Sequence, residues 1–162
     1  MTLLITPQEI KSALPIKNVD EEYVIPAIRL AQDKKIQLIL GTNLYEKLQQ
    51  FVESGSVPEP YATLHNLVKD VLLWQSMGEL TYTVTWKVRN AGVVQSYGEH
   101  IYTSTFGDAD QIQNNYFTNA NFYENKLQRY LDENRDKFPE LEPRNHSDYE
   151  PRETFQTTLY LL

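Results

Sequence analysis

The segment from Val24 to Phe51 constrains the fold of this chain most strongly, because it has the pattern of two helices joined at one glycine. Apolar or small residues recur at helical spacing before Gly41 and predict one buried stripe, at Ile28, Ala31 or Gln32, Ile36 and Ile39. Gly41 lies where a helix commonly ends in a left-handed residue. Asn43 and Glu46 have the spacing of a capping box, which predicts that a second helix begins there. The segment thus predicts a helical hinge.

Length and composition limit which folds and functions are possible for this chain. A chain of 162 residues is long enough for one domain that buries roughly 70% of its unfolded surface. No apolar run approaches the roughly 20 residues that a membrane-spanning helix needs, and no secretory signal is visible at the N-terminus. The absence of cysteine excludes disulfides and thiolate metal sites. A net charge of −7 disfavours a general nucleic-acid binder, which needs clustered Lys and Arg.

Two further helix starts are visible near the N-terminus. Thr6, Pro7 and Glu9 occupy the N-cap, N1 and N3 positions of a short helix that should end before Pro15. Asp20 can cap the next helix, in which case Pro26 either kinks that helix or belongs to its first turn.

The second half of the chain predicts a central helix, a hairpin and a last long helix. Residues 61–80 are apolar around so much of the helix that a central position is expected. A strand pattern follows, with Gly92 in the turn and Val93 to Tyr97 returning. Its apolar face is formed by Tyr82, Val84, Trp86 and Val88. The last helix begins near Asp108 and closes at Pro139. The predicted fold is mainly α: a compact bundle of about five helices with a β-hairpin at about 81–97 inserted in a body of 1–139, and an extended C-terminal tail at 140–162.

The sequence offers no clear catalytic or metal-binding constellation. The three histidines are far apart, and none has a partner at metal-ligand spacing. His146, Ser147 and Asp148 are adjacent, whereas a catalytic triad needs side chains that converge from separate elements, so a solvated turn is the better interpretation. No glycine-rich phosphate loop is present. We therefore expect no catalytic residue, no metal and no cofactor, and an enzyme is disfavoured.

The hinge segment carries a resemblance to a known family. The pattern comprises Ala27-Ile28, Ala31-Gln32, Ile39-Leu40-Gly41, Leu44-Tyr45 and Leu48, with Leu72 to Trp74 and Asn90 to Val94 further along. It resembles the head–tail connector proteins of tailed phages, which are adaptor or head-completion proteins of gp6-like or gp15-like type, including those of phages of gut Bacteroidetes. In element order the resemblance covers roughly Leu4 to Leu131, and the region past Glu140 is unmatched.

The resemblance implies a structural virion protein that is made in the host bacterial cytoplasm. Such proteins form a ring, typically a dodecamer, that docks beneath the portal protein and lies in the virion neck between capsid and tail. The ring extends the DNA channel through which the genome is packaged and ejected, and it carries later neck and tail proteins. DNA would pass without specific binding, and no membrane would be involved. An excess of acidic residues suits a lumen that repels phosphate, although net −7 is equally a solubility charge.

Two segments are candidates for assembly contacts. The apolar face of the hairpin packs either on the chain's own helices or on a neighbouring subunit or tail protein. The tail from Pro151 is too apolar at its end to remain in water, so it either docks on the portal or a neighbour, or folds back on its own core. Its apolar residues are Phe155, Leu159, Tyr160, Leu161 and Leu162.

Two other functions remain open. A cellular helical adaptor or regulatory module that binds one partner protein would show the same composition, caps and periodicity. Within a phage, a stopper or tail-completion protein would lie one layer further from the capsid.

Overall fold

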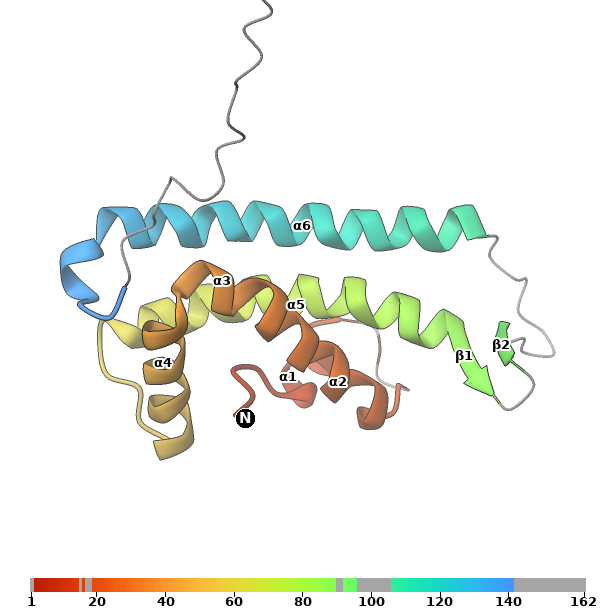
Figure 1. The fold of residues 1–162 in the computed structure, drawn as a ribbon, viewed down its shortest axis with the longest axis horizontal. Coiled ribbons are helices and arrows are strands. Elements are labelled where there is room, and N and C mark those ends of the chain that lie inside the picture. Colours follow the sequence, from red (N-terminus) through yellow and green to blue (C-terminus); the bar gives the residue numbers. More distant parts are fainter. Residues whose placement is uncertain (1, 15, 17–18, 90–91, 96–105, 142–162) are drawn as a thin grey trace, which may run out of the picture.

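A computed structural model describes residues 2–14, 16, 19–89, 92–95 and 106–141 (Figure 1). These residues are mainly helical, as predicted. The elements are α1 (Pro7–Ala13), α2 (Glu21–Ala31), the π-helical η1 (Gln32–Ile36), α3 (Gln37–Leu40), α4 (Thr42–Ser54), α5 (Tyr61–Thr85), β1 (Trp86–Arg89), β2 (Gly92–Gln95), α6 (Phe106–Glu133) and the 3₁₀ turn η2 (Arg135–Lys137). Because α2, η1 and α3 follow one another directly, the described residues form five helices and two short strands.

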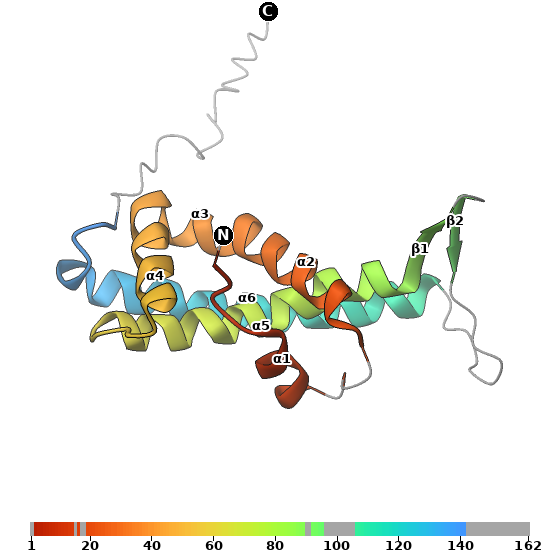
Figure 2. The ribbon, with the colours of Figure 1, turned by 90° about the horizontal axis from the view of Figure 1, so that it is seen from below.

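The two longest helices, α5 and α6, run antiparallel and side by side, and the body is elongated along them (Figures 1 and 2). α2 packs against α5 as well, so α5 is the central helix, as its composition predicted. Gly78 permits the close approach to α6, because a Cβ there would overlap the ring of Phe117. The buried side chains of this pair include Leu64, Val68, Leu72, Leu127 and Leu131.

The predicted start of α1 is confirmed. The Thr6 hydroxyl accepts a hydrogen bond from the Glu9 N–H at 3.2 Å, and a Glu9 carboxylate oxygen accepts one from the Thr6 N–H at 2.8 Å. Two backbone donors that the first turn leaves without partners are satisfied in this way. α2 begins after Asp20, whose side chain makes no capping bond, and Pro26 lies inside the helix instead of ending it.

Gly41 forms the corner between α3 and α4. Its N–H donates to the Gln37 carbonyl at 2.9 Å, and its own carbonyl accepts from the Tyr45 N–H at 3.1 Å, so this one residue ends one helix and begins the next. The predicted positive φ is confirmed at 74°. Its ψ of 163° differs from that of a left-handed helical residue and lies in a region open essentially to glycine alone.

The capping box predicted at Asn43 and Glu46 is wrong. α4 begins two residues earlier than predicted, at Thr42, with Gly41 instead of Asn43 at the N-cap position and no side-chain capping bond. The physical reason is that the Gly41 carbonyl already accepts the first hydrogen bond of α4. Asn43 is therefore inside the first turn, where its side chain cannot act as the N-cap.

The hairpin predicted at 81–97 is not seen in that form. α5 continues to Thr85, so Tyr82 and Val84 belong to a helix. Beyond it, β1 and β2 pair antiparallel over four residues each, from Trp86 opposite Gln95 to Arg89 opposite Gly92. Helix elongation costs less than starting a strand, so a 25-residue helix overrides a short alternating pattern at its end.

The chain after α6 returns to the core before the described residues end at Leu141. Phe138 is buried and its ring packs edge-on against Tyr61 and Tyr130, with centroid separations of 5.5 and 6.0 Å. The Tyr61 hydroxyl donates to the Glu140 carboxylate at 2.8 Å, and burial, together with this bond, raises the pKa of Tyr61 to about 12. α6 thus ends at Glu133, earlier than the predicted Pro139.

Replacing Gly41 by valine should lower the free energy of unfolding by about 1–3 kcal/mol, because a β-branched residue is strained at this φ and ψ. Urea denaturation followed by circular dichroism measures the change. Gly55, at φ 73° and ψ 9°, is the matched control: its left-handed helical geometry tolerates asparagine, so Gly55→Asn should cost little whereas Gly41→Asn should not. Equal stabilities of the Gly41→Asn and Gly55→Asn proteins would contradict the assigned geometry of the corner.

Candidate functional site

The residues before α1 are held against the helical corner by buried side chains. We name Thr2–Ile5 the N-terminal arm. Leu4 and Ile5 of the arm are buried in the core. Backbone groups of the arm meet side chains from η1, α4 and α5, so three elements far apart in sequence converge on one extended segment.

Gln32 is the centre of these contacts. Its side-chain oxygen accepts a hydrogen bond from the Leu4 N–H at 2.7 Å, and its amide nitrogen donates to the Thr2 carbonyl at 3.2 Å and to the Tyr45 hydroxyl at 3.0 Å. The Gln49 amide donates to the same two acceptors, at 3.0 and 3.2 Å. Gln32 is fully buried, so these bonds satisfy groups that would otherwise be costly to desolvate.

His65 completes the set from α5. Its Nε2 lies 2.7 Å from the Leu4 carbonyl, which can only accept, so Nε2 carries the proton. We name Gln32, Tyr45, Gln49 and His65 the arm clamp. The sequence analysis missed it. The one visible signal was Gln32, a polar amide on an otherwise apolar stripe.

The π-helical segment η1 begins at Gln32 and is tied to both long helices. Lys34 forms an ion pair with Glu79 of α5 at 3.3 Å, and Lys35 forms one with Glu124 of α6 at 2.9 Å. A π-turn inserts one extra residue into a helix and rotates the side chains that follow. In this chain Gln32, the first residue of η1, faces the core, and the two lysines that follow it reach α5 and α6.

The arm clamp is uncharged at neutral pH. Burial disfavours the charged imidazole and lowers the pKa of His65, although the bond to the Leu4 carbonyl opposes this. Burial also raises the pKa of the Tyr45 hydroxyl. Close by, burial favours the neutral form of Glu9, but hydrogen bonds from Lys69, at 2.6 Å, and from Thr6 outweigh it and lower the pKa of Glu9. Neutral groups that hydrogen-bond to the backbone of the arm position that segment.

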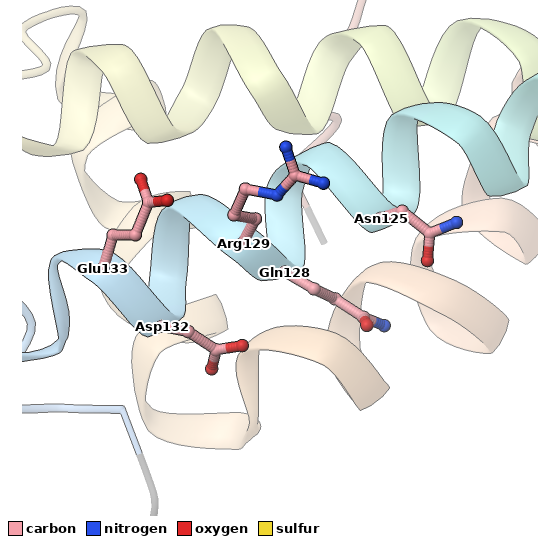
Figure 3. A pocket seen from close by; sticks show the side chains of 5 residues that line it. All are labelled: Asn125, Gln128, Arg129, Asp132 and Glu133. Carbon is pink, nitrogen blue, oxygen red and sulfur yellow. The ribbon is translucent and has the colours of Figure 1, made fainter.

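A shallow depression on α6 is a second candidate site (Figure 3). All five side chains that line it come from this one helix: Asn125, Gln128, Arg129, Asp132 and Glu133. Four of the five are exposed, and none is buried. A ligand there would meet one helix face without an enclosing wall, so the depression lacks the concave form of a small-molecule site.

The predicted site residues do not come together. Gly41 lies at the α3–α4 corner, whereas the strands that contain Trp86, Val88 and Gly92 lie at the opposite end of the body (Figure 1). Asn43 and Glu46 are exposed on α4. Phe155, Leu159, Tyr160, Leu161 and Leu162 lie outside the described residues. Among the described residues, no group of three or more His, Asp or Glu side chains could hold a metal ion, and no helix is both long and apolar enough to span a membrane.

The residues that carry the resemblance are core residues. Of the ten pattern residues between Ala27 and Leu48, nine are buried, with exposed fractions between 0 and 7%: Ala27, Ile28, Ala31, Gln32, Ile39, Leu40, Leu44, Tyr45 and Leu48. Two of the nine, Gln32 and Tyr45, belong to the arm clamp. The pattern therefore encodes the packing of the corner and the attachment of the arm.

Comparison with known proteins assigns a family. The chain belongs to DUF6712, a family of unknown function whose model matches residues 36–151. The match begins at the last residue of η1 and includes the Gly41 corner, α4, α5 and α6. No curated protein and no solved structure matches the chain.

Replacing Gln32 by leucine should lower the free energy of unfolding by about 1–3 kcal/mol, because the buried Leu4 N–H loses its acceptor. Gln49→Leu is the matched control, since both acceptors of Gln49 keep their bonds from Gln32 and the loss should be smaller. Chemical denaturation measures both variants. A loss for Gln49→Leu equal to that for Gln32→Leu would show that the Leu4 bond is not the dominant one.

Acidification should weaken the attachment of the arm. The pKa of folded His65 lies below 6.5, the value expected for the unfolded chain, so the unfolded state binds more protons below about pH 6.5 and stability falls there as pH falls. Glu9 adds a second loss below pH 4.5, because its folded pKa is also lowered. Urea denaturation across pH 4–8 should show a smaller slope between pH 5 and 6.5 for His65→Gln than for the parent. An unchanged slope would contradict the role of His65.

Proposed function

We propose that this protein is a structural subunit of a head–tail connector ring of a tailed phage. It would dock on the portal, extend the DNA channel and join capsid to tail in the virion neck. The observation that carries the proposal is that the connector-like pattern coincides with the buried corner of this fold, because residues that specify a core specify an architecture. A link from architecture to function is an analogy between folds, so it needs a direct test.

Exposed apolar side chains support an assembling subunit. Leu38 on α3 is 76% exposed and Phe122 on α6 is 66% exposed, with Leu30 and Ile112 exposed to a smaller degree. A closed ring contacts its neighbours through two different patches on each subunit. Apolar side chains on separate helices, α2–α3 and α6, suit such a head-to-tail contact better than a monomer in water.

The two ends of the chain's helical body are the proposed contact sites. The β1–β2 ribbon and the tail from Pro151 are the proposed contacts with neighbours, portal or downstream tail proteins, since a two-stranded ribbon is marginal alone and the tail ends in apolar residues. The proposed lumen is acidic, so that DNA slides past without specific binding. Lys69, paired with Glu9, would then face away from the DNA, as would Lys87 and Arg89.

A cellular protein-binding adaptor and a phage stopper or tail-completion protein are the alternatives. The location of the gene separates the first from a connector, because a connector gene should lie beside genes for a portal and a major capsid protein. The order of neck assembly separates the second, because a stopper binds only after the connector.

Mixing the purified protein with the portal protein encoded by the same genome should give rings docked on the portal in negative-stain electron microscopy. The protein alone serves as the control, since ring formation can require the portal as template. The absence of any complex by microscopy and by co-sedimentation would refute the connector proposal.

Deleting residues 151–162 should abolish incorporation into portal-containing particles while the helical body stays folded, because the described core ends before the deleted segment. Circular dichroism checks the fold, and immunoblotting of purified particles measures incorporation. Normal incorporation of the truncated protein would show that the tail is not the docking segment.

A further inference from the structure

The N-terminal arm and α1 form one continuous segment, residues 2–13, which we name the N-terminal unit. The capping box between Thr6 and Glu9 lies within this unit, so α1 carries its own helix start with it. α1 lies at the edge of the molecule and packs against α2, outside the pair of long helices (Figure 2). The unit is therefore a peripheral element that docks on α2, η1, α4 and α5, which we name the receiving helices.

The receiving helices bind the N-terminal unit through its backbone and through buried aliphatic side chains. The arm clamp contacts the Leu4 N–H and the carbonyls of Thr2 and Leu4. Leu4 and Ile5 of the arm and Ile10 of α1 are buried, with exposed fractions between 0 and 3%. Main-chain hydrogen bonds together with side-chain pockets are a recurring mode of recognising an extended segment from another chain. An identical unit from a second copy would make the same contacts.

Opposite charges also match between the N-terminal unit and the receiving helices. Glu9 of α1 pairs with Lys69 of α5 at 2.6 Å, and Lys11 of α1 lies 3.8 Å from Glu21 of α2. The Gln8 amide donates to the same Glu21 carboxylate at 2.9 Å. The unit thus carries one acidic and one basic group, each opposite a group of the other sign. Complementary charges fix the register of a docked segment and steer its approach.

Only residues 14–20 connect the N-terminal unit to α2. Fully extended, this segment would span roughly 23 Å, which is about twice the diameter of a helix with its side chains. Short hinge segments favour the exchange of the element that they carry. When the unit docks on another copy, its own contacts are kept and only those of residues 14–20 change. The exchanged form therefore costs little, and the local concentration of copies decides between the two forms.

We propose that the N-terminal unit is exchanged between copies of this chain, so that the unit of one copy docks on the receiving helices of the next. A second copy is the occupant because the clamp, the pockets and the charges already fit this segment. Each copy gives one unit and receives one, so exchange closes a dimer or runs head to tail around a ring. The inference concerns contacts between copies of this chain alone, so it does not rest on the connector proposal.

Cross-linking between copies tests the exchange, since the chain has no cysteine of its own. Thr2→Cys and Gln49→Cys proteins are mixed at high concentration, incubated, diluted and treated with a short bis-maleimide reagent. The Thr2 carbonyl lies 3.0 Å from the Gln49 amide nitrogen, so an exchanged unit holds the two cysteines of different copies together. This dimer should form at least about tenfold faster than in a matched mixture of Thr2→Cys and Asn115→Cys, whose second cysteine is exposed on α6. Equal rates would overturn the proposal.

Two full-length variants with complementary defects give a second test. Leu4→Asp should undock its own unit, because a charged side chain cannot enter the core, and it leaves the clamp intact. The double variant Gln32→Leu with His65→Leu removes both partners of the Leu4 backbone and leaves the unit intact. Each protein alone should be monomeric in sedimentation equilibrium, whereas an equal mixture should form a 1:1 dimer.

Ser12→Asp, at an exposed position of α1, is the matched control for Leu4→Asp. Its own unit stays docked and competes, so it should bind the double variant at least about tenfold more weakly than Leu4→Asp does. A mixture of Leu4→Asp and the double variant that stays monomeric, with both proteins helical by circular dichroism, would overturn the proposal. If either variant is unfolded, the cross-linking rates of the Thr2→Cys mixtures decide.

Discussion

The buried side-chain amide of Gln32 is the interaction on which the arrangement of the N-terminal half depends. It binds the arm on one side and the Tyr45 hydroxyl on the other, so it joins the first residues of the chain to both helices of the corner. A fully buried amide must find partners for its donor and acceptor atoms, and few arrangements of the arm and α4 provide them. The amide therefore restricts the arm and the corner to one relative placement.

Gly41 makes that placement possible. Without its positive φ the chain could not end α3 and begin α4 within one residue, and Tyr45 would not reach Gln32. The π-turn of η1 lies in the same region: it begins at the buried Gln32, and its Lys34 and Lys35 pair with acidic groups of α5 and α6. Three local irregularities, a glycine corner, a π-turn and a buried amide, thus serve one packing arrangement.

The buried and the exposed residues of this protein have different roles. The pattern from Ala27 to Leu48 is buried almost completely, so it marks how the helical body is built. In the proposed connector, assembly would then depend on other residues: the exposed apolar side chains of α2–α3 and α6, the β1–β2 ribbon, and the tail.

Several features were determined by the sequence alone, because short-range interactions decide them. Thr6 and Glu9 form a capping box within one turn. Only glycine tolerates the backbone angles at position 41. Residues 61–80 are so apolar that they form the central helix. Local competition decided two features against the predicted pattern: Gly41 had already begun α4, so Asn43 lost its capping role, and α5 continued through residues 81–85 in spite of an alternating pattern. Only the tertiary structure decided the rest. The partners of Gln32 lie 28 residues upstream and 13 downstream, and spacing along the chain cannot reveal contacts that form only when distant segments pack together.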